Sequence, residues 1–273
     1  AAVATTQSPG IDHRRNFYGI LRVSETTEDG HAERMLTHGR TRHGTQFLDE
    51  EGRRRATSYY GSHSGVAIGI TSLPRPRRVA VVGLGSGTIA AWGRDGDSYT
   101  FYEINPDVEA IARKWFTYLQ DSKAKTQVVL GDARIQMRRE LEAGHKNDFD
   151  FIAVDAFSSD AIPIHLLTAE AGELYRDRLA PGGILALHIS NRSINLEPVT
   201  RGLAKHLGWQ ARMMIALDDS TTGESTSRWV LLTQNRETFE HTNIRDTILG
   251  WGGPKEPVVY WTDDFASLWP LIR

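Results

Sequence analysis

From residue 78 onward, short apolar runs alternate with longer segments that carry apolar residues at helical spacing. The short runs are typical of strands buried on both faces. We predict strands at residues 79–82, 99–104, 127–130, 149–155 and 184–189, and helices at residues 88–94, 106–118, 133–142, 168–179 and 196–206. Such alternation predicts a parallel sheet with right-handed crossovers.

Two further apolar runs end this region, at residues 210–217 and 228–233. The polar segment between them is not a helix, so we predict an antiparallel hairpin at one edge of the sheet. Five parallel strands and a terminal hairpin give the seven-stranded, Rossmann-like α/β layout of S-adenosylmethionine-dependent transferases rather than that of dinucleotide dehydrogenases. We therefore assign this fold class to the larger part of the chain.

Residues 11–72 show a different pattern, with short mixed runs at residues 16–23, 33–37 and 43–48. Asp29-Gly30 separates the first two runs, and this pair is a strong hairpin signal. We predict a small antiparallel β unit and divide the chain into residues 1–75, the β unit, and residues 76–273, a nucleoside-binding catalytic domain.

Composition narrows the classes of partner. Lys plus Arg is 32 and Asp plus Glu is 34, so the net charge of −2 gives no reason to expect nucleic acid as a partner. The chain has no cysteine, which excludes disulfides and thiolate metal sites, and its 10 histidines show no metal-ligand spacing, so we expect no metal. No apolar stretch approaches the ~20 residues of a membrane span. Because the chain starts at Ala1 without Met, we expect a processed or excised product.

The first strand of the alternating region runs directly into Gly83, Gly85 and Gly87. Glycines there let the backbone turn sharply and approach a ligand closely. Their spacing is G-x-G-x-G, not the G-x-G-x-x-G of dinucleotide folds. Glu103 lies near the carboxyl end of the next strand, where an acid can accept hydrogen bonds from both hydroxyls of a ribose. Together they predict a nucleoside pocket.

Acids also follow the third and fourth predicted strands. Asp132, before Ala133, can cap the next helix or accept a hydrogen bond from an adenine amino group. Asp155 ends the fourth strand and Asp160 lies in the loop after it, where ligands of open α/β sheets bind. Two such carboxylates can bind a cationic amine and accept its proton, or they can cap the loop and the next helix.

Two further segments, one before the glycine loop and one near the end of the chain, each allow two interpretations. Gln46, Tyr60 and His63 precede the glycine loop, where the pair Tyr59-Tyr60 reads either as packed aromatic residues and a turn or as part of the site. Asp263 and Asp264 near the end of the chain read either as a surface cap or as further acids over the pocket.

With these motifs the sequence resembles the spermidine synthase family of aminopropyltransferases over residues 36–235. The resemblance rests on residues 43–46, 59–65, 83–87, 102–104, 131–132, 149–155 and 179–183. It implies that Gln46 contacts the side chain of the cofactor, Glu103 the ribose and Asp132 the adenine. It also implies that Asp155 assists deprotonation of the attacking amine. Relatives are often dimers, so a homodimer is expected.

The chain departs from the family pattern in the loop that contains Asp160, which is two residues longer, and in the Ser/Gly-rich segment around Tyr60 and His63. These departures resemble the divergent spermidine synthase-like domains fused behind membrane segments in some bacterial proteins. That likeness implies a membrane segment upstream and a location in the cytoplasm or on the cytoplasmic face of a membrane.

The expected reaction is displacement at a carbon bonded to a sulfonium, with S-adenosylmethionine or its decarboxylated form as cofactor. An aminopropyl group moves to a small-molecule amine, and methylthioadenosine leaves. The alternatives are a methyltransferase, a lyase or cyclase without acceptor, and a non-catalytic nucleoside-sensing module. We expect catalytic residues Asp155, Asp160 and Tyr60; substrate-binding residues His63, Asp263 and Asp264; and cofactor-binding residues Gln46, Gly83, Gly85, Gly87, Glu103, Ile104, Asp132, Ala133 and Asp155.

Overall fold

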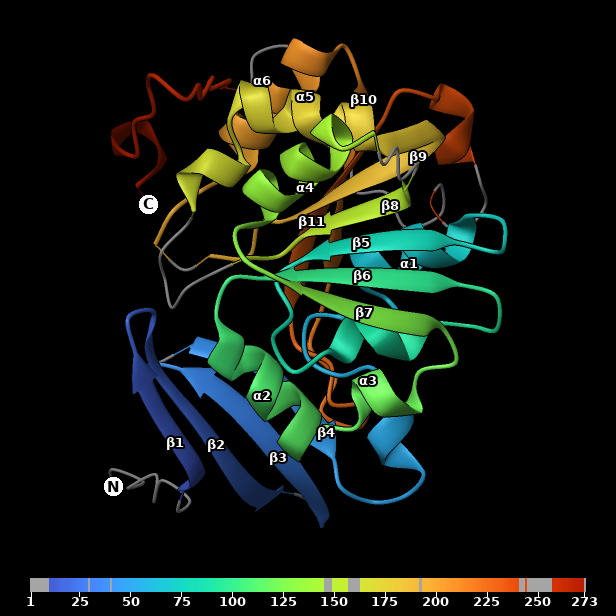
Figure 1. Cartoon of the computed structure of the whole chain (residues 1–273), viewed down its shortest axis with the longest axis vertical. Coiled ribbons are helices and arrows are strands. Elements are labelled where there is room, and N and C mark those ends of the chain that lie inside the picture. The colour runs from blue at the N-terminus through green and yellow to red at the C-terminus, as the bar shows by residue number, and fades with distance from the viewer. Residues whose placement is uncertain are drawn as a thin grey trace.

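Two sheets organise the chain (Figure 1). The structure is a computed structural model that describes residues 10–28, 30–39, 41–144, 149–156, 163–191, 193–240, 244 and 257–272. One sheet has four strands in the order β1-β2-β3-β4, and the other has seven in the order β10-β11-β9-β8-β5-β6-β7. The predicted fold class, a mostly parallel seven-stranded sheet with a small N-terminal β unit, is confirmed.

Five parallel strands form the centre of the seven-stranded sheet. The last two strands pair antiparallel with each other, and β11 also pairs antiparallel with β9, which is the predicted terminal hairpin at one sheet edge. The strands are β5 (Arg78–Val82), β6 (Ser98–Glu103), β7 (Lys125–Leu130), β8 (Phe149–Val154), β9 (Leu179–His188), β10 (Gln210–Ala216) and β11 (Ser227–Thr233).

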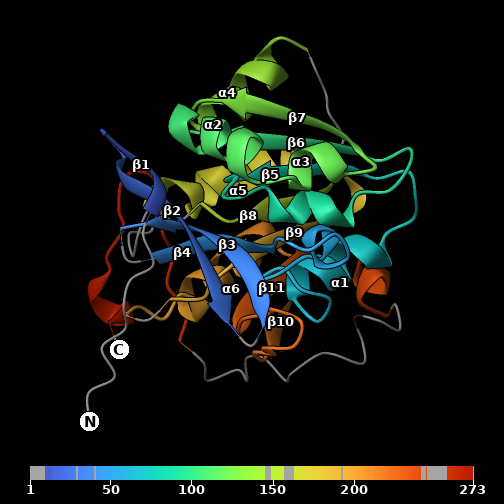
Figure 2. The same cartoon turned by 90° about the horizontal axis from the view of Figure 1, so that it is seen from below.

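Helices cover both faces of this sheet (Figures 1 and 2). The two faces are separate apolar cores, because successive residues of a strand point to opposite sides. In β5, for example, Val79 and Val81 belong to one buried cluster and Ala80 and Val82 to the other. The helices are α1 (Gly65–Ser72), α2 (Pro106–Trp115), α3 (Tyr118–Asp121), α4 (Ala133–Glu142), α5 (Ala169–Arg178) and α6 (Glu197–Leu207), with short 3-10 helices η1 (Gly52–Arg54), η2 (Thr88–Trp92), η3 (Ile164–Leu166), η4 (Arg236–Glu240) and η5 (Trp269–Leu271).

The N-terminal sheet packs against the core that contains Val79 and Val81. Its strands are β1 (Gly10–Asn16), β2 (Gly19–Glu28), β3 (His31–His38) and β4 (Thr41–Phe47). Leu21, Val23 and Leu36 are buried with side chains of α2 and of the seven-stranded sheet. The sequence indicated three of these strands and missed β1, whose charged residues show no alternation. The packing brings β2, β3 and β4 next to the loops that follow the parallel strands.

The predicted helix over residues 106–118 ends earlier, at Trp115. Asn105 caps its start and Pro106 occupies the first turn, as the sequence indicated. At the other end, the N–H of Thr117 donates to Oε1 of Gln46 at 3.0 Å instead of to a helical carbonyl. The backbone turns extended at Phe116, and a contact from the N-terminal sheet, remote in sequence, takes the next N–H. The predicted helix at residues 88–94 is also different, since residues 88–92 form the 3-10 helix η2.

The division at residue 75 stays a prediction. Helix α1 precedes this boundary, yet its apolar side chains Val66 and Ile70 share a buried cluster with Phe151 and Leu231 of the seven-stranded sheet. Among the helices of the described ranges, none combines the length and the apolar character that a membrane crossing requires.

Candidate active site

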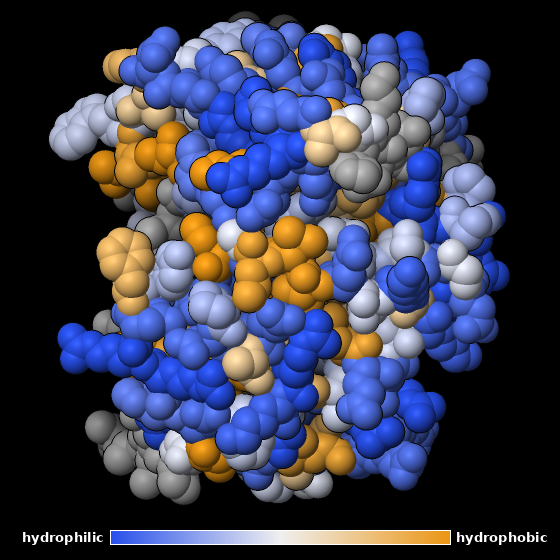
Figure 3. Space-filling view, in the orientation of Figure 1, coloured by the Kyte–Doolittle hydropathy of each residue, from blue (hydrophilic) through white to orange (hydrophobic). Residues whose placement is uncertain are grey.

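A cavity of about 260 Å³ lies where the parallel strands end. Its floor comes from residues that follow β5, β6, β7 and β8, and its cover from β2, β3 and β4 of the N-terminal sheet. Figure 3 shows hydrophobic side chains gathered near the middle of the face seen in Figure 1. Ile104, the residue after β6, and Leu130, the last residue of β7, are about half exposed. Ligands of open α/β sheets bind in such a crevice.

The glycine loop after β5 is held from two sides. Gly83 has φ +99°, and a Cβ there would collide with the carbonyl oxygen of Asp155. Gly85 has φ +54°, and a Cβ there would lie 2.6 Å from the carbonyl oxygen of His43. Both positions therefore require glycine, for backbone conformation and for space. The loop passes between β8 and β4, and both glycines line the cavity.

Glu103 ties the glycine loop to β6. Its Oε2 accepts the N–H of Leu84 and its Oε1 accepts the N–H of Asn105, each at 2.9 Å. Burial raises the pKa of the Glu103 carboxyl, and the backbone hydrogen bonds oppose this effect. An ionised carboxylate offers about four acceptor positions, so acceptor capacity remains beyond the backbone N–H groups of Leu84, Ile104 and Asn105. Glu103 lines the cavity, as Ile104 does.

Asp132 performs the capping role that the sequence offered as one alternative. Its Oδ1 accepts the N–H of Ile135 at 2.9 Å at the start of α4. Its Oδ2 lies 2.8 Å from Nε2 of His165, and this hydrogen bond is the largest of the effects that lower the pKa of Asp132. Asp132 and Ala133 both line the cavity. The contact of Asp132 with adenine is therefore compatible with its capping role and stays a prediction.

Asp155 lies at the centre of a hydrogen-bonded chain. The hydroxyl of Tyr60 donates to Oδ2 of Asp155 at 2.6 Å, and Nδ1 of His188 lies 2.6 Å from Oδ1. Nε2 of His188 lies 2.8 Å from Oγ of Ser190. The ring of Trp229 stacks on His188 with centroids 4.6 Å apart. Both oxygens of a carboxylate that lines the cavity are thus fixed by buried neighbours.

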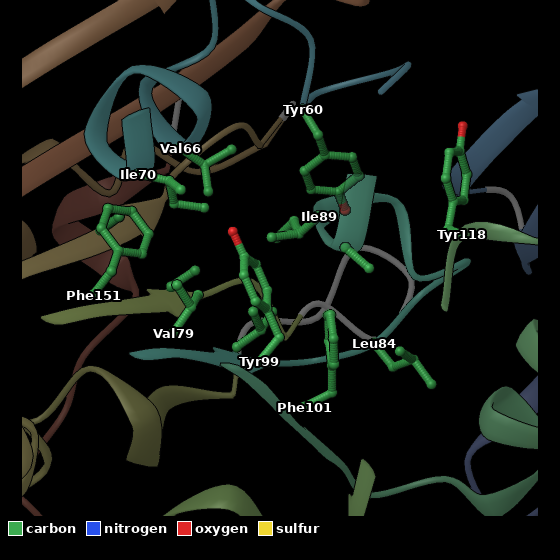
Figure 4. Close-up of a cluster of buried hydrophobic side chains, with 14 of the residues drawn as sticks. Tyr60, Val66, Ile70, Val79, Leu84, Ile89, Tyr99, Phe101, Tyr118 and Phe151 are labelled. Atoms are coloured by element: carbon green, nitrogen blue, oxygen red, sulfur yellow. The ribbon is translucent and has the colours of Figure 1, made fainter. Parts of the chain in front are cut away.

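Tyr60 reaches Asp155 from the segment that precedes α1. Figure 4 shows it in the same buried cluster as Ile89 and Tyr118. Burial is the main cause that raises the pKa of the Tyr60 hydroxyl, and the charge of Asp155 adds to it. Tyr60 therefore stays protonated at neutral pH and acts as a donor. It is the donor to Asp155, and it is not among the residues that line the cavity.

Several expected site residues lie elsewhere. The Nε2 of Gln46 donates to the carbonyl of Arg53 at 2.8 Å and to Oγ1 of Thr117 at 2.9 Å, so its amide is used inside the protein. Gly87 packs against Leu119 and does not line the cavity. His63 is largely exposed beside Glu224, 3.4 Å from its carboxylate.

The acids near the end of the chain are also apart from the cavity. Asp263 accepts from Arg134 and Thr168, and the hydrogen bond from Arg134 is the main cause that lowers its pKa to about 2. It borders a shallow depression beside Asp132 rather than the cavity. Asp264 is exposed. Asp160 lies outside the described residues, so its place stays a prediction.

Sequence reasoning missed the histidines of the site. His188 ends β9, the strand beside β8, so its polar side chain at the end of an apolar run was the available signal. His43 of β4 and His165 of η3 line the cavity and carried no such signal. Among the described residues no cluster of His, Asp and Glu is arranged to hold a metal ion.

The chain is similar in sequence to a known aminopropyltransferase. It is 34% identical over 128 residues to a polyamine aminopropyltransferase of Vibrio vulnificus (strain CMCP6), and the match covers 46% of this chain and 42% of that protein. The chain thus matches less than half the length of this curated relative. No family model matches the chain.

Solved structures share the fold. A spermidine synthase in complex with the transition state analogue AdoDATO has a TM-score of 0.60 at 15% identity, covering 93% of this chain and 82% of that one. A probable spermidine synthase from Corynebacterium glutamicum ATCC 13032 has a TM-score of 0.60 at 18% identity, covering 83% and 81%. The resemblance to the spermidine synthase family is therefore confirmed, in sequence over part of the chain and in fold over most of it.

Proposed function

We propose that this chain transfers an aminopropyl group from the sulfonium of an adenosylated cofactor to an amine and releases methylthioadenosine. One observation carries the proposal. The carboxylate of Asp155, fixed by Tyr60 and His188, lines the same cavity as Glu103 and the glycine loop. A nucleoside held by Glu103, with adenine beside Asp132, would place its sulfur near Asp155.

The charge of the cavity favours the decarboxylated form of S-adenosylmethionine. Its described lining residues include the acids Glu103, Asp132 and Asp155 and no lysine or arginine. A sulfonium and a terminal ammonium are matched by such a lining, since opposite charges attract more strongly away from bulk water. The additional carboxylate of the intact cofactor would find no permanent cation among these residues.

The reaction needs alignment and a neutral nucleophile. As the nitrogen–carbon bond forms, the carbon–sulfur bond breaks and its electron pair stays on sulfur, which becomes a neutral thioether. Holding nitrogen, carbon and sulfur in line is the contribution of the cavity. A free alkylamine has a pKa of about 10, near that of lysine, so it must lose a proton before it attacks. Asp155 accepts that proton, directly or through one water.

Product analysis tests the proposal. The protein is incubated with S-adenosylmethionine or its decarboxylated form, each with and without putrescine, and the products are read by mass spectrometry. Methylthioadenosine with a longer polyamine is the expected result. S-adenosylhomocysteine would indicate a methyltransferase, and methylthioadenosine without a consumed acceptor a lyase or cyclase. Binding of the cofactor without turnover would indicate a nucleoside-sensing module.

Other expectations belong to the same proposal. A homodimer and a location in the cytoplasm or on the cytoplasmic face of a membrane fit an enzyme of this kind, and they remain predictions. The roles of Asp160, His63, Asp263 and Asp264 toward an amine substrate remain predictions as well.

A further inference from the structure

Strand β4 lies directly on the glycine loop. The carbonyl of His43 packs against Gly85, and Gly44 packs closely against the side chain of Ser86. No larger residue fits at Gly44, which has φ +142°. His43 is among the residues that line the cavity. It therefore stands beside the part of the loop where the sulfur of an adenosylated ligand would lie.

The imidazole of His43 has an unused nitrogen. Its Nε2 is buried and has no hydrogen-bond partner among the described residues. The neighbouring ring of His38, 5.5 Å away between centroids, is already engaged, since its Nε2 lies 2.7 Å from the carbonyl oxygen of Tyr18. A buried nitrogen without a partner costs free energy, which a ligand atom that reaches it would recover.

The ring is neutral at neutral pH. Burial is the main cause that lowers the pKa of His43 to about 4; the charge of His38 lowers it further and the carboxylate of Asp155 opposes both. A neutral imidazole with its proton on Nδ1 presents a lone pair at Nε2. It can accept a hydrogen bond from a cation without charge repulsion.

Gln46, the residue expected to contact the cofactor side chain, is not available for this task. It lies on the same strand, but its amide is bound to Thr117 and Arg53. His43 is the residue of β4 that lines the cavity. A contact from the N-terminal sheet to the cofactor chain would therefore come from His43.

We propose that Nε2 of His43 accepts a hydrogen bond from the terminal ammonium of the aminopropyl chain on sulfur. The inference rests on the proposed function and adds a ligand-binding residue to it. The ammonium is preferred over a carboxylate as the partner because the acids Glu103, Asp132 and Asp155 line the same cavity. His43 then helps to select a cofactor chain that ends in an amine.

Calorimetric titration with two ligands tests the inference. Methylthioadenosine contains the nucleoside and sulfur but no ammonium, whereas decarboxylated S-adenosylmethionine contains all three. His43→Leu is expected to weaken the second ligand about tenfold, the effect of one hydrogen bond to a charged group, and to change the first less than about twofold. His43→Gln, which keeps an acceptor, is expected to recover most of the affinity.

The outcomes separate the two proposals. If His43→Leu weakened the affinity for both ligands equally, the residue would contribute only to packing, and the inference would be overturned. Unchanged affinity for the decarboxylated cofactor in that variant would overturn it as well, while the proposed function would stand. A wild-type protein that binds neither ligand would overturn both. Below about pH 5, near the pKa of His43 at about 4, the wild type should lose more affinity for the ammonium-bearing ligand than for methylthioadenosine.

Discussion

Nδ1 of His188 lies 2.6 Å from Oδ1 of Asp155, across the ends of two neighbouring parallel strands. The oxygen of Ser190 accepts the N–H of Arg228 at 2.8 Å, which leaves its own proton for Nε2 of His188. This arrangement satisfies each group when the imidazole proton sits on Nδ1 and is donated to Asp155. His188 is thus a positioning residue for the proposed proton acceptor.

Replacing His188 should harm turnover more than binding. His188→Leu leaves one oxygen of Asp155 without its donor, and we expect kcat to fall about 100-fold, the effect of a misaligned group. His188→Asn keeps an N–H near the place of Nδ1 and should stay within about tenfold of wild type. Steady-state kinetics with the decarboxylated cofactor and putrescine measure this. Equal activity of the His188→Leu variant and wild type would contradict the assigned role.

Asp155→Asn should slow the chemical step and leave the affinity for the nucleoside unchanged. Without the proton acceptor we expect turnover to fall by about 10²–10⁴, while calorimetry with methylthioadenosine should give a dissociation constant close to that of wild type. Asp95→Asn is the matched control, because Asp95 is an exposed acid before β6 that does not line the cavity. Undiminished turnover in Asp155→Asn would remove this carboxylate from the mechanism.

The affinity for the nucleoside should depend on pH through Glu103. Burial raises the pKa of this carboxyl, so it takes up a proton at a pH above the ordinary glutamate value of about 4.3. The protonated form accepts fewer hydrogen bonds from a ribose, and methylthioadenosine should therefore bind progressively more weakly as the pH falls from 7 toward that value. Glu103→Gln should bind weakly at every pH, with the glutamate-dependent part of the profile removed. An identical pH profile in both proteins would argue against ribose binding by Glu103.

The stability of the sheet face behind the cavity should depend on Arg178. Its fully buried guanidinium donates to Oε2 of Glu140 at 2.7 Å, and the hydroxyl of Tyr102 donates to the same oxygen at 2.8 Å. Arg178→Met leaves that network incomplete and should lower the free energy of unfolding by about 3 kcal/mol. Arg176→Met on the same helix removes an exposed pair and should cost less than about 1 kcal/mol. Urea unfolding of both variants measures the difference, and equal stability would contradict the assignment.

The order of elements along the chain was predictable because it depends on local patterns. The glycine loop, Asn105-Pro106 and the acids at strand ends each carry their signal within a few residues, and the parallel sheet then brings Glu103 and Asp155 to one edge. The arrangement around them depends on partners distant in sequence. Nothing near Gln46 reveals that Thr117 takes its amide, and nothing near Asp263 reveals Arg134.

The hydrogen-bonded chain at Asp155 shows the same limit. Tyr60 approaches from a loop 95 positions earlier, and His188 from the neighbouring strand. A sequence shows that each residue can donate or accept, but not which carboxylate oxygen it meets. Tyr60 was expected at the site on resemblance. His188 was marked only by its place at the end of β9, and His43 comes to the cavity through the placement of the N-terminal sheet.

The fate of the three-carbon chain on sulfur tests the central claim most directly. Decarboxylated S-adenosylmethionine with an isotopic label in that chain is incubated with putrescine and the protein, and the label is followed by mass spectrometry. The account predicts that the label appears on the nitrogen of a longer polyamine while methylthioadenosine is released unlabelled. Label that stays in the cofactor, or that leaves without joining an amine, would contradict it.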